Sequence, residues 1–437
     1  MAGRRRKKLK AEQPTASSLT QTSTRPLLSH SHSAARRPRG SRLHFPECRG
    51  SHLRETSDYI SQSTAVRRVW PAATTSLWTT FPRVLERAAR LWTIFPRVLW
   101  GRRRRASSAI VLVKEVWCWL VLYFCLVMPL FIGDQRIDLS LSAGQLVQRH
   151  SHLEERAKAL TSQPARTVEP KGFLYVRQRE FAVTTPNDSS VYILGSDDAT
   201  TCHLVVLRDT GCGATCLAHC DGSDTDAEVS MIISSVKSFS SNIEGGRLEL
   251  HLIGGFIDDK GLSQDLTSHL LRAFDTQQDE VHLVTLCVTE LNDMVKNGIH
   301  IPIIYGIAVN VKTAEIFSAT FQDQGPDEDI RSARSLTGGA MISIYDVKTE
   351  QLCIGPYYWM PFPFLDFWLE QDDEQILKKL STSPLAEPPH FVAHIRSTLM
   401  FLKEHPFPEN TLFLNKKSRL YKKNEGGLWE RVLTDKM

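Results

Sequence analysis

The sequence predicts an α+β protein: two stacked β-sheets flanked by helices in an α-β-β-α sandwich-like arrangement, preceded by a disordered basic N-terminal extension. Three observations favour this class. Segments typical of strands outnumber segments typical of helices. The helical segments do not alternate one for one with strands, which argues against a doubly wound parallel sheet. The net charge also changes sharply near residue 127, so two different kinds of sequence are joined there.

The extension is residues 1–127. It contains 24 Lys and Arg residues against 6 Asp and Glu, a net charge of +18, whereas residues 128–437 carry a net charge of −13. No sustained apolar pattern occurs before about residue 66, so this part cannot bury enough apolar area to offset its ordering entropy, and disorder is expected. Arginine clusters can bind nucleic acid or anionic lipid, but no nucleic-acid-binding motif accompanies them. A solvated tail without a nucleic-acid partner is therefore favoured.

The end of the extension overlaps an uncharged stretch of 17 residues, 116–132. This is at the short limit for a membrane-spanning helix, roughly 17–25 residues. A span here would place the rest of the chain in an oxidising lumen, in conflict with the free thiol considered below, and a removable signal peptide would start closer to residue 1. We favour a functional polypeptide that begins at Met128, with residues 128–437 as one domain. A single-pass membrane protein is the alternative.

The helices of this domain are predicted from apolar residues spaced three or four positions apart. In residues 143–160 these are Leu146, Val147, Leu153, Ala157 and Leu160. Helices are expected at 143–160, 227–242, 263–275 and 391–404, with a polar loop running into a short helix within 322–335.

The strands are predicted from short apolar or alternating segments bounded by turn residues. Residues 247–254 alternate Leu248, Leu250 and Leu252 on one face and close at Gly254-Gly255. Further strands are expected at 129–132, 173–176, 180–183, 190–194, 202–207, 215–219 and 280–289, in hairpins of 305–311 with 315–321 and of 341–346 with 351–354, and within 411–431.

The nine cysteines, an odd number, show no dense paired framework, which favours a reducing compartment. Four cysteines and two histidines between Cys202 and Cys220 fit a structural zinc site only loosely, because neighbours such as His219 and Cys220 point to opposite faces of a strand. We expect no metal and no cofactor. Four other cysteines of the domain are expected to be small buried apolar residues: Cys212, Cys216, Cys287 and Cys353.

Cys202 and His219 form a second candidate site. Cys202 follows a polar loop and precedes an apolar strand, a place where a nucleophile can be fixed and reachable. Antiparallel pairing of 202–207 with 215–219 about a centre near residue 210.5 would put Cys202 directly beside His219. The imidazole could then deprotonate the thiol.

Five segments carry a family resemblance: LGSDDATTCH at 194–203, LAHCDG at 217–222, CVTELND at 287–293, YGIAVN at 305–310 and STSPLAEPPHF at 381–391. From Met128 onward the chain resembles the protein N-terminal asparagine amidohydrolases, whose chains begin Met-Pro-Leu. A more distant similarity is to bacterial chemoreceptor glutamine deamidases, which carry a catalytic Cys, a His seventeen residues later and a hydroxyl residue six before. His219 and Ser196 occupy those positions, and the glutamine deamidases have stacked sheets flanked by helices.

The resemblance implies deamidation of N-terminal asparagine in proteins or peptides to aspartate, with Cys202 as nucleophile, His219 as acid and base, and Ser196 orienting His219. Backbone N–H groups near Thr201 and Cys202 would hold the oxyanion. Three acids near the site are candidates for binding the substrate's α-ammonium group: Asp197, Asp198 and Asp221.

The family context implies a role in N-degron-dependent protein degradation, in the cytoplasm and also the nucleus, and we expect a monomer. A non-catalytic module that binds peptide termini remains the rival class.

Overall fold

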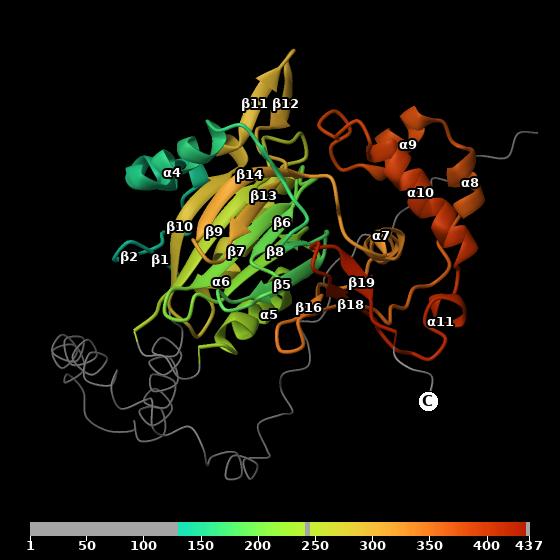
Figure 1. Ribbon diagram of the computed structural model, residues 1–437. Coiled ribbons are helices and arrows are strands. Elements are labelled where there is room, and N and C mark those ends of the chain that lie inside the picture. Colours follow the sequence, from blue (N-terminus) through green and yellow to red (C-terminus); the bar gives the residue numbers. More distant parts are fainter. Residues whose placement is uncertain (1–129, 241–244, 434–437) are drawn as a thin grey trace, which may run out of the picture. The chain divides into compact units, whose positions relative to one another are not determined.

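An eight-stranded sheet forms the centre of the computed structural model, which describes residues 130–240 and 245–433 (Figure 1). All of these residues belong to one unit, 91–437. In spatial order the strands are β15 (Ile342–Ser343), β5 (Glu180–Thr184), β8 (Thr215–Cys220), β7 (His203–Asp209), β9 (Leu248–Gly254), β10 (Val281–Val288), β1 (Leu130–Ile132) and β2 (Gln135–Arg136).

A five-stranded sheet packs on one face of the large sheet. Its strands are β3 (Arg166–Val168), β14 (Glu315–Phe321), β13 (Ile307–Asn310), β6 (Ile193–Ser196) and β4 (Phe173–Tyr175). Leu204 and Leu217 of the large sheet and Leu194 and Ile307 of the smaller sheet share one buried apolar cluster, the intersheet cluster. The predicted stacked-sheet class is therefore confirmed.

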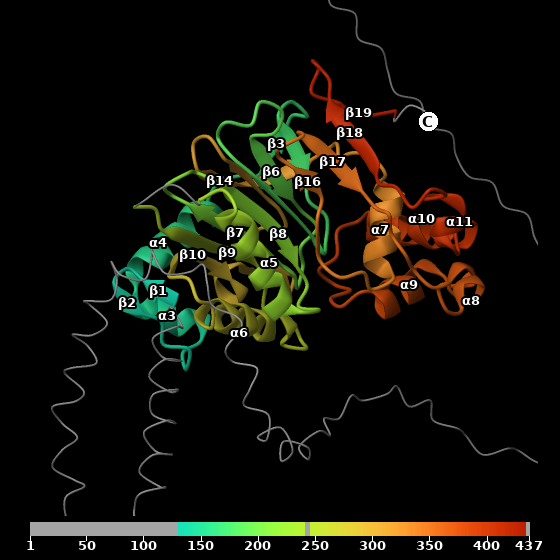
Figure 2. The same cartoon turned by 90° about the horizontal axis from the view of Figure 1, so that it is seen from below.

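Helices cover the other face of the large sheet, as Figure 2 shows for α5 and α6. These helices, with α3, contribute to a second apolar cluster. Two smaller sheets, β11–β12 and β16–β17–β18–β19, and five more helices, α7 to α11, complete the described chain. The helices are α3 (Ala143–Arg149), α4 (Ser151–Thr161), α5 (Thr225–Lys237), α6 (Leu262–Asp275), α7 (Glu328–Leu336), α8 (Leu365–Glu370), α9 (Asp373–Leu380), α10 (Phe391–Glu404) and α11 (Pro408–Thr411), and the small strands are β11 (Asp293–Lys296), β12 (Ile299–Pro302), β16 (Tyr345–Asp346), β17 (Gln351–Ile354), β18 (Arg419–Lys423) and β19 (Trp429–Arg431).

Several predicted boundaries differ from the structure. The expected single helix at 143–160 is two helices, because His150 leaves the helical conformation with ψ of 77°. The strand expected at 190–194 begins instead at Ile193, since the Asp188 carboxylate accepts hydrogen bonds from the N–H groups of Ser190 and Val191, both at 2.8 Å, and folds this stretch into a turn. The helix expected at 227–242 ends at Lys237.

A buried ion pair joins α7 to the sheets. The Arg331 guanidinium donates to both carboxylate oxygens of Glu180, at 3.1 and 2.6 Å, and also to the carbonyl of Tyr175 at 2.8 Å. Both charged side chains are essentially inaccessible to solvent. Although burial opposes it, the charge of Arg331 holds the pKa of Glu180 below its ordinary value. The pair therefore remains charged inside the protein.

Candidate active site

The backbone of Cys202 is fixed by two glycines at the end of β9. The N–H of Gly255 donates to the carbonyl of Cys202 at 3.0 Å. Gly254 has φ of 130°, and a Cβ atom there would lie 2.5 Å from the Cys202 carbonyl oxygen. Only glycine accommodates both this φ and this close approach. The Gly-Gly end of the predicted strand therefore positions the candidate nucleophile.

The Asn292 side chain holds the Gly254-Gly255 turn in place. This fully buried side chain donates to the carbonyls of Gly255, at 2.9 Å, and Ile304, at 3.1 Å. Its oxygen accepts from the N–H of Ile304 at 2.9 Å. Asn292 lies in one of the segments that carry the family resemblance, but the sequence predicted no role for it. The one sign of its role in the sequence is an asparagine amide where an apolar strand passes into a loop.

The pairing of β7 with β8 differs from the expected register. Leu204 lies opposite His219 and His203 lies opposite Cys220. The centre of the hairpin is therefore one residue further along the chain than expected. The Asp209 side chain accepts from the N–H of Gly211 at 2.7 Å, and the Asp209 carbonyl accepts from Gly213 at 2.8 Å, which sets this turn. Cys202 is therefore a diagonal neighbour of His219, not its direct partner. Because side chains alternate along a strand, both still face the intersheet cluster.

His219 is held by a hydrogen bond that crosses between the two sheets. Its Nδ1 lies 2.8 Å from the Oγ of Ser196 on β6, and both side chains are buried. Burial lowers the pKa of His219 to about 4. At neutral pH the imidazole is therefore uncharged and able to accept a proton.

The Cys202 thiol is half-buried and belongs to a free cysteine. Burial, followed by the negative charges of Asp221 and Glu387, raises its pKa well above the ordinary value, while Arg179 acts in the opposite direction. The thiol is therefore neutral in the protein without substrate.

The two acids at the loop before Cys202 lie in different surroundings. Asp197 is half-buried and accepts a hydrogen bond from the hydroxyl of Tyr175 at 2.5 Å. Burial and the nearby charge of Asp198 raise its pKa to about 6. Asp198 is exposed and has its carboxylate 3.1 Å from Nε2 of His390. Asp197 is therefore the less solvated of the two.

Asp221 and Thr201 already have protein partners. The Asp221 carboxylate accepts from Arg179 at 2.5 Å and from Gln178 at 2.8 Å. Although burial opposes it, the hydrogen bond from Arg179 keeps the pKa of Asp221 below its ordinary value. The hydroxyl of Thr201 lies 3.1 Å from that of Thr382. Of the three acids expected to bind an ammonium group, Asp221 is the one paired with an arginine.

The zinc alternative is not supported by the geometry. Cys216 and Cys220 face the helix side of the sheet and His219 the opposite side, so β8 cannot present them to one ion. Within 130–240 and 245–433, no group of three or more His, Cys, Asp or Glu side chains could hold a metal ion.

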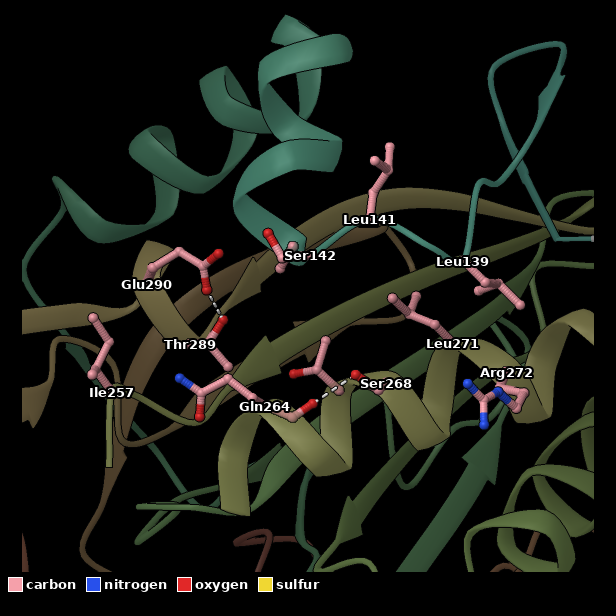
Figure 3. Close-up of a pocket in the computed structure, with 12 residues that line it drawn as sticks. Leu139, Leu141, Ser142, Ile257, Gln264, Ser268, Leu271, Arg272, Thr289 and Glu290 are labelled. Carbon is pink, nitrogen blue, oxygen red and sulfur yellow. Dashed lines mark hydrogen bonds between the residues drawn. The ribbon is translucent and has the colours of Figure 1, made fainter. Parts of the chain in front are cut away.

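A pocket of about 320 Å³ opens on the helix side of the large sheet (Figure 3). Its lining includes Leu141, Leu271 and Thr267, and Thr267 contacts Nε2 of His203 at 2.7 Å. Since His203 and Cys202 are neighbours on an extended chain, their side chains point to opposite faces. This pocket therefore lies on the face of the sheet that Cys202 does not reach.

In the part of the chain that the structure describes, none of the helices has the length and apolar character that crossing a bilayer requires. Most of the 116–132 stretch lies outside the described residues, as does the basic extension.

Comparison with known proteins gives consistent matches. A family model described as protein N-terminal asparagine amidohydrolase matches residues 163–431. Curated relatives with that name from Sus scrofa and Homo sapiens are 68% and 66% identical over 305 residues, which are 70% of this chain and 98% of each relative. A relative of the same name from Arabidopsis thaliana is 29% identical over 307 residues, 64% of this chain and 87% of its own length.

Proposed function

Since the chain belongs to the protein N-terminal asparagine amidohydrolase family, we propose that it hydrolyses the side-chain amide of N-terminal asparagine in proteins and peptides. The products are ammonia and an N-terminal aspartate. The observation that supports the chemistry best is the buried Ser196–His219 hydrogen bond on the same face as Cys202. A Cys–His pair with an orienting hydroxyl is an arrangement suited to nucleophilic amide cleavage.

In the proposed reaction the Cys202 sulfur attacks the carboxamide carbon while His219 takes the thiol proton. If the Nδ1–H of His219 donates to Ser196, its Nε2 is the base. The tetrahedral intermediate collapses, His219 returns the proton to the leaving nitrogen, and ammonia departs from an acyl-thioester. A water molecule, deprotonated by His219, then attacks the thioester, and the thiol and aspartate side chain are released.

Proton transfer during the attack fits the two ionisation states. The thiol and the imidazole are both neutral before substrate binds, since the pKa of Cys202 is raised and that of His219 is lowered. The proton therefore moves as the carbon–sulfur bond forms. The resulting imidazolium is next to the nitrogen that must leave.

Substrate binding involves the loop before Cys202. Backbone N–H groups near Thr201 and Cys202 are proposed donors to the oxyanion, with Thr201 fixed by Thr382. Asp197 and Asp198 are the acids proposed to surround the substrate α-ammonium group. The third candidate, Asp221, is bonded to Arg179, and its charge raises the pKa of the Cys202 thiol.

Ammonia release from synthetic peptides tests this function. We expect a peptide beginning with Asn to release ammonia and gain an N-terminal Asp, while an N-terminal Gln peptide reacts roughly 10–200-fold more slowly, because one methylene is worth about 1–3 kcal/mol of discrimination. The readouts are enzymatic ammonia determination and peptide mass. A peptide with internal Asn only is the control, and equal release from it would contradict terminal specificity.

Ser196→Ala is expected to lower kcat about tenfold with little change in KM, because loss of one hydrogen bond to the imidazole costs about 1 kcal/mol or slightly more. Steady-state kinetics on the Asn peptide measure this. Ser196→Thr keeps the hydroxyl and should recover much of the rate. An Ala variant with unchanged kcat would show that Ser196 does not position His219.

We further propose that the product enters N-degron-dependent degradation in the cytoplasm and nucleus. The same proposal treats residues 128–437 as the functional domain, acting as a monomer, with 1–127 outside it. Intact-mass measurement of the native protein tests the boundary, and a species of full 437-residue mass would oppose it.

A further inference from the structure

A segment near the C-terminus, residues 381–390, lies across the loop that leads to Cys202. Three of its contacts are with this loop and with Tyr305. The hydroxyl of Thr382 lies 3.1 Å from that of Thr201, the Ala386 carbonyl accepts from the Tyr305 hydroxyl at 2.9 Å, and the His390 ring is 3.1 Å from the Asp198 carboxylate. Tyr305 in turn accepts from the N–H of Ala199 at 3.0 Å through its carbonyl. The segment therefore lies close to the loop that carries the candidate nucleophile.

Glu387 is the acidic residue of this segment. The hydroxyl of Ser381 donates to it at 2.5 Å and accepts from the N–H of Ser383 at 2.9 Å, so a turn closed on Ser381 fixes the carboxylate. Within the described residues, no Lys, Arg or His side chain forms an ion pair with Glu387, unlike Asp221 and Asp198. Burial raises its pKa to about 7.

An unused hydroxyl lies beside this carboxylate. Ser383 is 8% exposed, and its Oγ has no hydrogen-bond partner in the structure. It is nevertheless close enough to Glu387 to lower that residue's pKa. A buried hydroxyl without a partner costs free energy, and a ligand with N–H groups would satisfy it.

We propose that Glu387, together with the Ser383 hydroxyl, binds the α-ammonium group of the substrate. This inference rests on the proposed function and adds the residue that selects a free chain terminus. An ammonium has three N–H donors and one positive charge, which match a fixed carboxylate and a free hydroxyl. An acetylated terminus lacks the charge and would leave Glu387 buried without compensation.

Binding there also affects the nucleophile. The charge of Glu387 is among those that raise the pKa of Cys202, after burial and Asp221. A cation bound to Glu387 cancels that charge and favours ionisation of the thiol. The substrate's own terminus therefore assists the proton transfer that starts the reaction.

Peptide affinity in a Cys202→Ala background tests the assignment without depending on turnover. Adding Glu387→Gln is expected to weaken binding of a free-amine Asn peptide about 10–100-fold by calorimetry, because a charge-assisted hydrogen bond is lost. Binding of the acetylated peptide should stay within about twofold of its starting value. Ser383→Ala is a second variant with an expected several-fold loss. Glu425→Gln, an exposed glutamate in the β18–β19 turn, is the matched control and should change neither. Equal losses for both peptides, or none, would overturn the assignment.

Iodoacetamide labelling of Cys202 is a second measurement, in which Glu387→Gln should increase the rate while it decreases peptide affinity. Glu387→Gln removes a negative charge near the thiol, so labelling at neutral pH should become faster while affinity for the free-amine peptide falls. Glu425→Gln should leave the labelling rate unchanged. A slower or unaltered rate in Glu387→Gln would contradict the coupling to Cys202. Failure of the wild-type protein to release ammonia would instead count against the proposed function, while the binding comparison would still report on Glu387.

Discussion

Cys202→Ala is expected to reduce ammonia release from an Asn-initiated peptide by about 10⁴-fold or more, because it removes the thiol that would form the proposed acyl-enzyme. The partner base, His219, would remain in place through its bond to Ser196. Affinity for the peptide should change little, since the side chain removed is small. Continuous ammonia determination and peptide calorimetry measure the two quantities.

Cys353→Ala is the matched control for this experiment. Cys353 is also free and half-buried, but it lies on β17 in the separate four-stranded sheet. Full activity in this variant with loss in Cys202→Ala would assign the reaction to one sulfur. Ammonia release that survives Cys202→Ala would end the nucleophilic mechanism and favour the non-catalytic binding module, provided that thermal unfolding shows both variants folded.

Arg331→Met is expected to lower the free energy of unfolding by about 3–5 kcal/mol, because it leaves the Glu180 carboxylate buried without its cation. Four hydrogen bonds from the guanidinium are lost, two to Glu180 and one each to the carbonyls of Tyr175 and Gln324. Urea unfolding followed by circular dichroism measures the loss. This is the largest effect on stability that we expect from one substitution away from the site.

The double variant Arg331→Met, Glu180→Leu separates charge burial from packing. It should be more stable than Arg331→Met alone, since no uncompensated charge remains. Lys403→Met is the surface control: its ammonium pairs with Asp366 at 2.7 Å, but both side chains are largely exposed, and a change of about 0–1 kcal/mol is expected. If the two variants lost equal free energy of unfolding, leaving the Glu180 charge buried without a partner would cost no more than breaking a surface ion pair.

The sequence alone predicted the stacked sheets and most of their strands, because alternation of leucines such as those of β9 reports directly on a half-buried strand. It did not predict the break at His150, where apolar spacing continues across both helices and only the backbone angles change. It also gave no sign of α8 and α9, whose short lengths leave little periodicity to detect. Both helices pack against α10.

The candidate site was predicted in part. Ser196 and His219 are hydrogen-bonded, a contact that was expected from the resemblance, although their catalytic roles stay predictions. The side-by-side pairing of Cys202 with His219 was wrong by register, since the turn at Asp209 sets it and turn type is not readable from glycines alone. Glu387 is 185 positions from Cys202 in sequence, and only tertiary structure brings such residues together.

The hydrogen bond between Ser196 and His219 joins one side chain from each layer of the sandwich. Loosening of the layers by even a fraction of an ångström would disturb this bond before either sheet lost its own ladder. Turnover therefore depends on how closely the two sheets are packed. Heating or mild denaturant should abolish turnover before the strand content falls.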